Sequence, residues 1–190
     1  MPPKSKISKN DILTTALDIL RKHGEDGINA RAIASSLNCS TQPIFSNYIS
    51  MEELRQDVIK EAYSVYLDYQ QDELAQNKYP PYKASGMAYI RFAKEEKELF
   101  KLLFMRDRST EKINRGDRHL DSIIEIICKQ TGLSREQAQK LHLELWIYVH
   151  GIAAMLVTDY LELDEDTVSE ILTDAYEGIK TRFITMEVKA

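Results

Sequence analysis

The sequence predicts an all-α protein of about nine helices, and three observations lead to this class. Apolar residues recur every three or four positions along most of the 190 residues, as on helices with one buried face. Seven glycines and five prolines are too few turn residues for a fold of many strands. Several of the apolar runs also begin with a helix-capping sequence.

The composition sets the class of protein. An apolar content of 43% and a charged content of 29% are typical of a globular domain and exclude a disordered tail, a collagen-like repeat and a membrane channel. Cys39 and Cys128 have no CxxC spacing, so we expect reduced thiols. The basic start at 1–6 is not followed by an apolar stretch of signal-peptide length. We therefore expect a cytoplasmic protein.

The first two helices are short and have clear ends. The first is expected over about 9–23, where Ser8 begins a capping sequence and Gly24 provides a stop. The second follows Asn29, a favourable N-cap residue, and ends at Asn38. Asparagine is one of the few residues besides glycine that tolerates a left-handed backbone, so it suits the turn that follows.

The third and fourth helices begin at serine caps. The third is expected to begin at Ser40 and to end near Tyr48. A capping box, Ser50 with Glu53 three residues later, begins a long fourth helix that reaches Tyr69. A charged segment at 106–118 is expected to be a loop or a frayed helix start. The remaining helices are expected at about 82–94, 97–105, 120–131, 134–160 and 165–186.

Charge is distributed unevenly along the chain. Residues 1–50 contain six Lys or Arg and four Asp or Glu, whereas residues 51–190 contain 19 and 26. A positive N-terminal part on an acidic body is expected if only that part approaches phosphate groups. Chance variation over 50 residues explains the same difference, so charge alone does not decide the function.

The tight connection between the second and third helices has the spacing of a helix-turn-helix. In that unit the second helix presents its N-terminal residues to base edges in the major groove. Segment 40–48 is rich in suitable side chains, since Gln42 and Asn47 can each grip adenine. Ile44 is expected to anchor the segment inward, with Phe45 as an alternative second anchor. A polar surface helix of an ordinary bundle has the same composition, so both interpretations stay open here.

A longer run of spaced residues favours DNA binding. It reads G-x-x-x-R-x-I-A-x-x-x-x-x-S-x-x-x-I-F-x-x-Y-x-S-x-E-E-L from Gly27 to Leu54, and it makes residues 8–60 resemble the DNA-binding domain of the TetR family of bacterial transcription regulators. The resemblance implies a DNA-binding domain over 1–50, extending into the fourth helix, and an effector-binding and dimerisation domain over 51–190. The candidate DNA contacts that it implies are Lys9, Arg31, Ser40, Thr41, Gln42, Pro43, Phe45, Ser46, Asn47 and Tyr48.

The sequence departs from the family pattern at three positions. Asn38 stands where the family usually has Gly, which Asn can satisfy in a left-handed turn. Phe45 stands where a Tyr usually donates its hydroxyl to a phosphate, and Met51 replaces a common Lys. Because two phosphate contacts are missing, we expect modest non-specific affinity for DNA and a shallow dependence on salt.

The C-terminal part also resembles the family. Residues 145–152 carry a Trp-x-x-x-His-Gly run, which is similar to the signature of one C-terminal domain type. The apolar run 146–157 is expected to be buried and not to span a membrane. The resemblance implies that the helices at 134–160 and 165–186 form a four-helix bundle with a second subunit. Two recognition helices about 34–36 Å apart then fit a palindromic operator.

The resemblance also implies a pocket for a small-molecule effector among the middle helices. Aromatic side chains are the candidates for its lining, although each of them also suits simple core packing. The candidates are Tyr89, Phe92, Phe100, Phe104, Trp146 and His150.

Other classes of function are weighed against a ligand-responsive repressor. An enzyme is not expected, because the sequence has no HExxH zinc motif, glycine-rich phosphate loop or GxSxG elbow, and no histidine stands in a Glu-x-x-His pair. No catalytic residue, metal site or cofactor is therefore predicted. The alternative is a helical ligand sensor or protein-interaction module that kept the fold but lost DNA binding.

Overall fold

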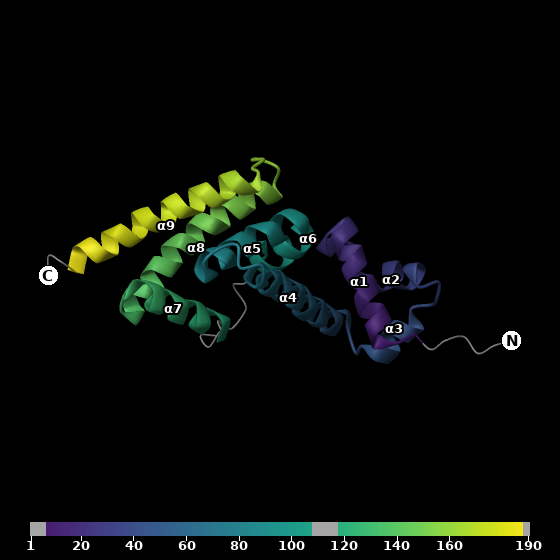
Figure 1. Ribbon diagram of the computed structural model, residues 1–190. Coiled ribbons are helices and arrows are strands. Elements are labelled where there is room, and N and C mark those ends of the chain that lie inside the picture. Colours follow the sequence, from purple (N-terminus) through teal and green to yellow (C-terminus); the bar gives the residue numbers. More distant parts are fainter. Residues whose placement is uncertain (1–6, 108–117, 188–190) are drawn as a thin grey trace. The chain divides into compact units, whose positions relative to one another are not determined.

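The computed structural model describes residues 7–107 and 118–187. Within these residues the regular elements are nine α-helices, one 3₁₀ turn and one π-helical turn, which confirms the all-α class (Figure 1). The chain forms two compact units. Unit 1 contains residues 1–67 and 96–106, and unit 2 contains residues 68–95 and 107–190. The functional boundary expected at residue 50 stays a prediction.

Helices α1 to α4 follow one another in unit 1, and α4 continues into unit 2. A later segment of the chain, α6 with η2, belongs to unit 1 as well. The elements of unit 1 are α1 (Lys9–His23), η1 (Glu25–Gly27), α2 (Ala30–Ser36), α3 (Gln42–Asn47), the first part of α4 (Met51–Ala75), α6 (Lys97–Phe100) and η2 (Lys101–Met105).

The expected ends of the first two helices are confirmed. The Asp11 N–H donates to the Ser8 hydroxyl, and the Asp11 carboxylate accepts from the Ser8 N–H, which completes a capping box. Gly24 ends α1 at φ 70°. The Asn29 side chain accepts from the Ala32 N–H and begins α2. Asn38 follows α2 at φ 51°, the left-handed conformation expected of it.

The caps of α3 and α4 differ from expectation. Thr41, not Ser40, precedes α3, and its side chain makes no capping hydrogen bond. The Glu53 N–H donates to the Ser50 hydroxyl as in a capping box, but the Glu53 carboxylate accepts from the N–H of Ile49 instead of Ser50. The Glu53 carboxylate therefore accepts from an N–H group four residues earlier in the chain, where a capping box uses the one three residues earlier. Either bond satisfies an N–H group near the helix start that has no partner within the helix.

The core of unit 1 joins the short helices to α4 and α6. Apolar side chains from five helices are at most 1% exposed, so each short helix contributes at least one fully buried residue to a common core. These residues are Ile12, Ala16, Leu20, Ile33, Ile44, Tyr48, Leu54, Val58, Leu99 and Phe100.

One helix expected in the middle of the chain has two parts. The run expected at 97–105 is an α-helix over Lys97–Phe100, followed by the wider π-helical turn η2. Four of its apolar residues, Leu99, Phe100, Leu102 and Leu103, are buried. Because they lie almost next to each other, the run has no polar side from which a 3.6-residue period can be recognised.

Unit 2 is built around α8. Its helices are the end of α4, α5 (Pro81–Glu95), α7 (Arg118–Thr131), α8 (Arg135–Val157) and α9 (Glu165–Glu187), and α8 packs against α5, α7 and α9. Helix α8 ends three residues before Tyr160, the expected end. Asp159 turns left-handed at φ 55°, and the Tyr160 N–H donates back to the Met155 carbonyl. The loop expected at 106–118 lies mainly outside the described residues.

Helix α8 is also the one described helix that is long and apolar enough to cross a membrane. The core helix of a soluble protein meets the same criterion, so this finding is weak evidence for a membrane span. Seven of its residues are buried within unit 2: Ala138, Leu141, Leu145, Ile152, Ala153, Leu156 and Val157.

The left-handed turn at Asn38 gives a prediction about stability. Asn38→Ala is expected to lower the free energy of unfolding by about 1 kcal/mol, because alanine tolerates a positive φ less well than asparagine. Asn38→Gly should be more stable than Asn38→Ala, since glycine adopts this backbone freely. Urea unfolding followed by circular dichroism measures both. A glycine variant less stable than the alanine variant would contradict this account of the turn.

Candidate nucleic-acid interface

Helices α2 and α3 and the turn between them form a helix-turn-helix. The turn is closed by two backbone hydrogen bonds, from the Asn38 N–H to the Ser35 carbonyl and from the Cys39 N–H to the Ala34 carbonyl. Helix α1 packs against both α2 and α3. Ile33 and Ile44, both 0% exposed, hold the two helices to the core, so their opposite faces remain open to solvent. This geometry suits a recognition helix.

The candidate contact residues differ in exposure. Lys9, Arg31, Ser40, Gln42, Phe45 and Ser46 are exposed, whereas Tyr48 is buried and the remaining candidates are partly covered. Phe45 is 52% exposed, so it lies on the open face of α3 and is not a second anchor beside Ile44. The partly covered candidates on this segment are Thr41, Pro43 and Asn47.

Two polar side chains of α3 are engaged within the protein. The Ser46 hydroxyl donates to the Gln42 carbonyl at 2.9 Å. The Asn47 amide donates to the Pro43 carbonyl at 2.8 Å and to the Ile7 carbonyl at 3.5 Å. Asn47 therefore uses its donor group to hold α3 and the segment before α1. A bidentate grip on adenine needs that same donor group, so the internal bond competes with this contact.

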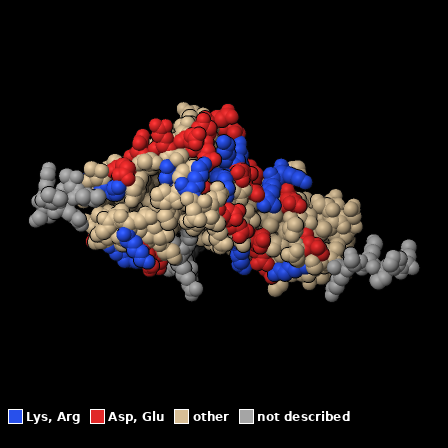
Figure 2. Space-filling model, viewed as in Figure 1, with Lys and Arg blue, Asp and Glu red and all other residues tan. Residues whose placement is uncertain are grey.

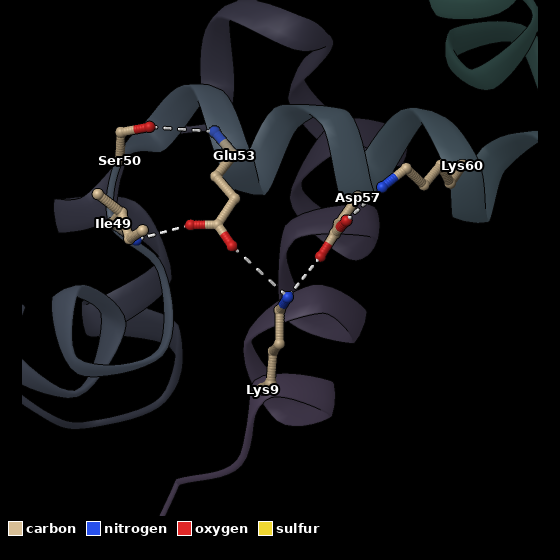
Figure 3. Close-up of polar contacts among 6 residues, drawn as sticks. All are labelled: Lys9, Ile49, Ser50, Glu53, Asp57 and Lys60. Atoms are coloured by element: carbon tan, nitrogen blue, oxygen red, sulfur yellow. Dashed lines mark hydrogen bonds and ion pairs between the residues drawn. The ribbon is translucent and has the colours of Figure 1, made fainter.

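Lys9 is engaged as well, in a network drawn in Figure 3. Its ammonium group lies 2.8 Å from an oxygen of Asp57 and 3.9 Å from an oxygen of Glu53, both on α4. Lys60 contacts Asp57 from the same helix at 3.0 Å. The hydrogen bond to Asp57 raises the pKa of Lys9, and the hydrogen bonds from Lys9 and Lys60 lower the pKa of Asp57. Lys9 thus links the start of α1 to α4.

Tyr48 completes this network from the end of α3. The Lys9 ammonium lies 4.5 Å from the centre of its ring, a cation–π contact. Tyr48 is only 1% exposed, and burial raises the pKa of its hydroxyl. Its hydroxyl oxygen has no hydrogen-bond partner among the described residues. A side chain so deeply buried positions α3. The DNA contact that the sequence resemblance implies for Tyr48 stays a prediction.

Ile49 is a surface residue that the sequence reasoning missed. It follows the end of α3 and is 94% exposed, and Figure 3 shows its backbone N–H held by the Glu53 carboxylate. No pattern in the sequence marks it, because a single apolar residue after a helix can be buried or exposed. The acidic pair Glu53 and Asp57, four residues apart on α4, was also missed, although this spacing places both carboxylates on one face of a helix.

The charge of unit 1 is nearly balanced. Its described residues carry nine Lys or Arg and ten Asp or Glu, and the face seen in Figure 2 has both signs interspersed. Two of the lysines that made residues 1–50 positive, Lys4 and Lys6, lie outside the described residues. Within α2, the turn and α3, the one basic residue is Arg31, which is exposed. This interface therefore offers few cations to phosphate groups.

The candidate effector residues are divided between the two units. Phe100 and Phe104 belong to unit 1, where their rings lie 5.2 Å apart and Phe104 also meets Tyr66 edge-on. The other four belong to unit 2. Of these, Phe92 is fully buried and meets the ring of Tyr69.

Tyr89, Trp146 and His150 form a cluster in unit 2. The Tyr89 hydroxyl lies 2.9 Å from Nδ1 of His150, and the Trp146 ring stacks on the imidazole at a centroid distance of 5.0 Å. Burial lowers the pKa of His150 and favours its neutral form. Seven residues before Tyr89 on α5, Tyr82 makes a similar contact with His142 at 3.1 Å. Two Tyr–His pairs therefore join α5 to α8.

The described part of the chain shows no metal-binding arrangement. No three His, Cys, Asp or Glu side chains gather there in positions that suit an ion.

Comparison with known proteins shows which family the chain resembles. The family model for a tetracyclin repressor-like C-terminal domain matches residues 82–176, half of the chain. A search of curated proteins finds no match.

Several solved structures share the fold. A TetR-like transcriptional regulator from Rhodococcus sp. RHA1 has a TM-score of 0.65 and 13% identity, over 88% of this chain and 92% of that one. A protein of unknown function from the same organism has a TM-score of 0.70 and 17% identity, over 96% and 99%. A TetR family member from Streptomyces coelicolor A3 has a TM-score of 0.58 and 13% identity, over 87% and 96%.

The ion pair at Asp57 predicts a pH dependence. Because the pKa of Asp57 is lower in the folded protein than in the unfolded chain, its contribution to stability is present above about pH 4. That contribution is lost as the pH falls through the folded pKa. As the pH is lowered from about 5, the urea midpoint of Asp57→Asn should therefore fall less than that of the wild type. Urea unfolding at pH values about 0.5 units apart measures both midpoints.

Glu61→Gln is the matched control, since Glu61 is an exposed carboxylate on the same helix. It should retain the wild-type dependence on pH. Identical acid profiles for Asp57→Asn and the wild type would show that the Lys9 network does not stabilise unit 1.

Proposed function

The chain belongs to the TetR family of transcriptional regulators, and from this membership we propose that it is a repressor that binds a palindromic DNA operator as a homodimer and responds to a ligand. The observation that carries the proposal is the helix-turn-helix of unit 1, in which α3 is anchored by Ile44 and leaves its opposite face open.

Gln42 and Arg31 are the polar groups best suited to DNA. Gln42 stands at the N-terminal end of α3, where a recognition helix meets base edges, and its side chain is exposed. No hydrogen bond engages its amide within the described part of the chain. Arg31 projects from α2 and can reach a phosphate. Ser40 and Thr41 precede α3 and offer hydroxyl groups to the DNA backbone.

An acidic surface on unit 2 favours an approach of DNA through unit 1. Figure 2 shows acidic side chains gathered over the first half of α9 and the loop before it. Phosphate groups are repelled by such a surface. The exposed acidic residues of this region are Glu162, Asp164, Glu165, Asp166, Glu170 and Asp174.

The outer face of α8 supports a homodimer. Contact between water and a row of large apolar side chains is unfavourable. In a dimer with two-fold symmetry, the same row of a second copy covers these side chains. Ile147 is 59% exposed and lies in the middle of the helix. The large apolar residues of α8 that are exposed in the single chain are Leu143, Trp146, Ile147, Tyr148 and Met155.

We assign the ligand response to unit 2. The cluster of Tyr89, Trp146 and His150 offers an aromatic surface together with a hydroxyl and an imidazole, groups that suit a small organic molecule. A ligand that binds better to a state with low DNA affinity releases the operator, and its effect equals the difference between its affinities for the two states.

A second candidate function is a helical sensor that has lost DNA binding. It is favoured by the near balance of charge in unit 1, because phosphate contacts supply most of the non-specific affinity for DNA. A mobility-shift assay with genomic fragments at low salt, without added ligand, separates the two candidates. Retarded fragments support the repressor, and failure to retard any fragment supports the sensor.

Two substitutions test the DNA contacts. Gln42→Ala is expected to weaken binding to the selected operator by about 1–3 kcal/mol, because a bidentate contact to a base is lost. Arg31→Ala should weaken binding to all sequences and reduce the slope of log affinity against log salt by about 1. Fluorescence anisotropy with operator and scrambled duplexes measures both. An unchanged sequence preference for Gln42→Ala would exclude it as a base contact.

The dimer is tested on α8. Ile147→Glu places a charge in the proposed interface and should shift the protein from dimer to monomer in analytical ultracentrifugation. Gln71→Glu adds the same charge at an exposed polar position of α4, outside this apolar row, and should leave the dimer intact. A wild-type protein that stays monomeric at all concentrations would refute the proposed assembly.

A further inference from the structure

We propose that Phe45 reads the C5-methyl group of thymine in the major groove, so that the operator contains a thymine that is recognised through an apolar contact. The inference rests on the proposed DNA binding and specifies its chemistry. It starts from the position of Phe45 on the open face of α3, where its ring is 52% exposed beside the fully buried Ile44.

Exposure alone does not mark a site, because single apolar residues are common on protein surfaces. The position of Phe45 does. It is the fourth residue of a six-residue helix whose buried side is occupied by Ile44, so its ring lies on the side that a helix-turn-helix turns toward base pairs. Ile49, after the end of the helix, is also 94% exposed.

The polar alternatives on this face are largely engaged elsewhere. The Ser46 hydroxyl and the Asn47 amide donate to backbone carbonyls of α3 itself. Lys9 is held by Asp57. Gln42 is left as the main polar reader, and one such residue specifies few base pairs. A further contribution to specificity therefore has to come from a contact that needs no hydrogen bond.

The chemistry of the major groove identifies the group that Phe45 meets. Thymine is the one standard base with a methyl group there, and apolar side chains including phenylalanine contact it. Cytosine at the same place offers an amino donor, which a phenyl ring leaves without a hydrogen-bond partner. Phe45 thus favours thymine over cytosine by gaining an apolar contact and by leaving a donor unsatisfied.

Deoxyuridine provides the direct test, because it pairs with adenine as thymine does but lacks the methyl group. The full-length protein first selects duplexes from a random library. Each thymine of the selected half-site is then replaced by deoxyuridine, and affinity is measured by fluorescence anisotropy. The expected result is a loss of about fourfold at one position, the factor that matches the burial of one methyl group.

Substitutions at position 45 and a control assign the effect. Phe45→Ala should bind the thymine and deoxyuridine duplexes equally, whereas Phe45→Tyr, which keeps the ring, should retain the difference. Gln42→Ala is the matched control on the same face, and it should lose affinity for both duplexes but retain their ratio. Because Phe45 and Gln42 are exposed, all these variants should melt within a few degrees of the wild type, which circular dichroism checks.

The outcomes separate this inference from the proposed function. A wild type that binds DNA specifically but does not distinguish thymine from deoxyuridine at any position overturns the methyl contact and leaves the repressor intact. A ratio unchanged by Phe45→Ala overturns the assignment to Phe45. Failure to select any duplex refutes the proposed function and the inference together. Dissociation of the dimer by Phe45→Ala would show that a protein surface, and not DNA, covers this ring.

Discussion

A helix of six residues is too short to be stable in water by itself, and the whole interface depends on how α3 overcomes this limit. Burial of Ile44 and Tyr48 attaches its inner face to the core of unit 1. The Asn47 amide holds its last turn from within, and the Lys9 ammonium lies against the Tyr48 ring while bound to α4. The orientation of α3 is therefore set by contacts at its back and its end, and not by its own hydrogen bonds.

This way of holding α3 has a consequence for its chemistry. A polar side chain that fixes the helix is less available to a partner, and the same holds for a lysine bound by a carboxylate. Asn47, Ser46 and Lys9 act in this structural role, while no contact within the described residues engages the side chains of Gln42 and Arg31. The proposed recognition surface is therefore low in charge and partly apolar, whereas most DNA-binding surfaces are strongly positive.

The sequence predicted those parts of the fold that depend on neighbouring residues. The cap at Ser8, the left-handed Asn38 and the buried Ile44 follow from local spacing and backbone preference. The direction of Phe45 did not follow, because six residues contain fewer than two helical turns and leave the period ambiguous. The partner of Lys9 lies 48 positions away at Asp57, and no local pattern pairs them.

Neighbouring residues in the sequence also do not predict that residues 96–106 belong to unit 1. This segment stands between two stretches of unit 2 in the chain, yet it packs with the residues of unit 1. Leu99 and Phe100 complete the core there, and Arg21 of α1 forms a two-point ion pair with Glu96. A contact between residues 75 positions apart leaves no mark on the periodicity of either segment.

That interleaving limits how the protein can be recombined. A chimaera joined at residue 50 would combine the helix-turn-helix of one parent with segment 96–106 of the other parent. Because both belong to unit 1, side chains from different parents would meet in its hydrophobic core. Exchange of unit 1 as a whole between two homologous chains therefore requires three crossover points along the gene, near residues 67, 95 and 106. The helix-turn-helix and the distant segment 96–106 must then be transferred together.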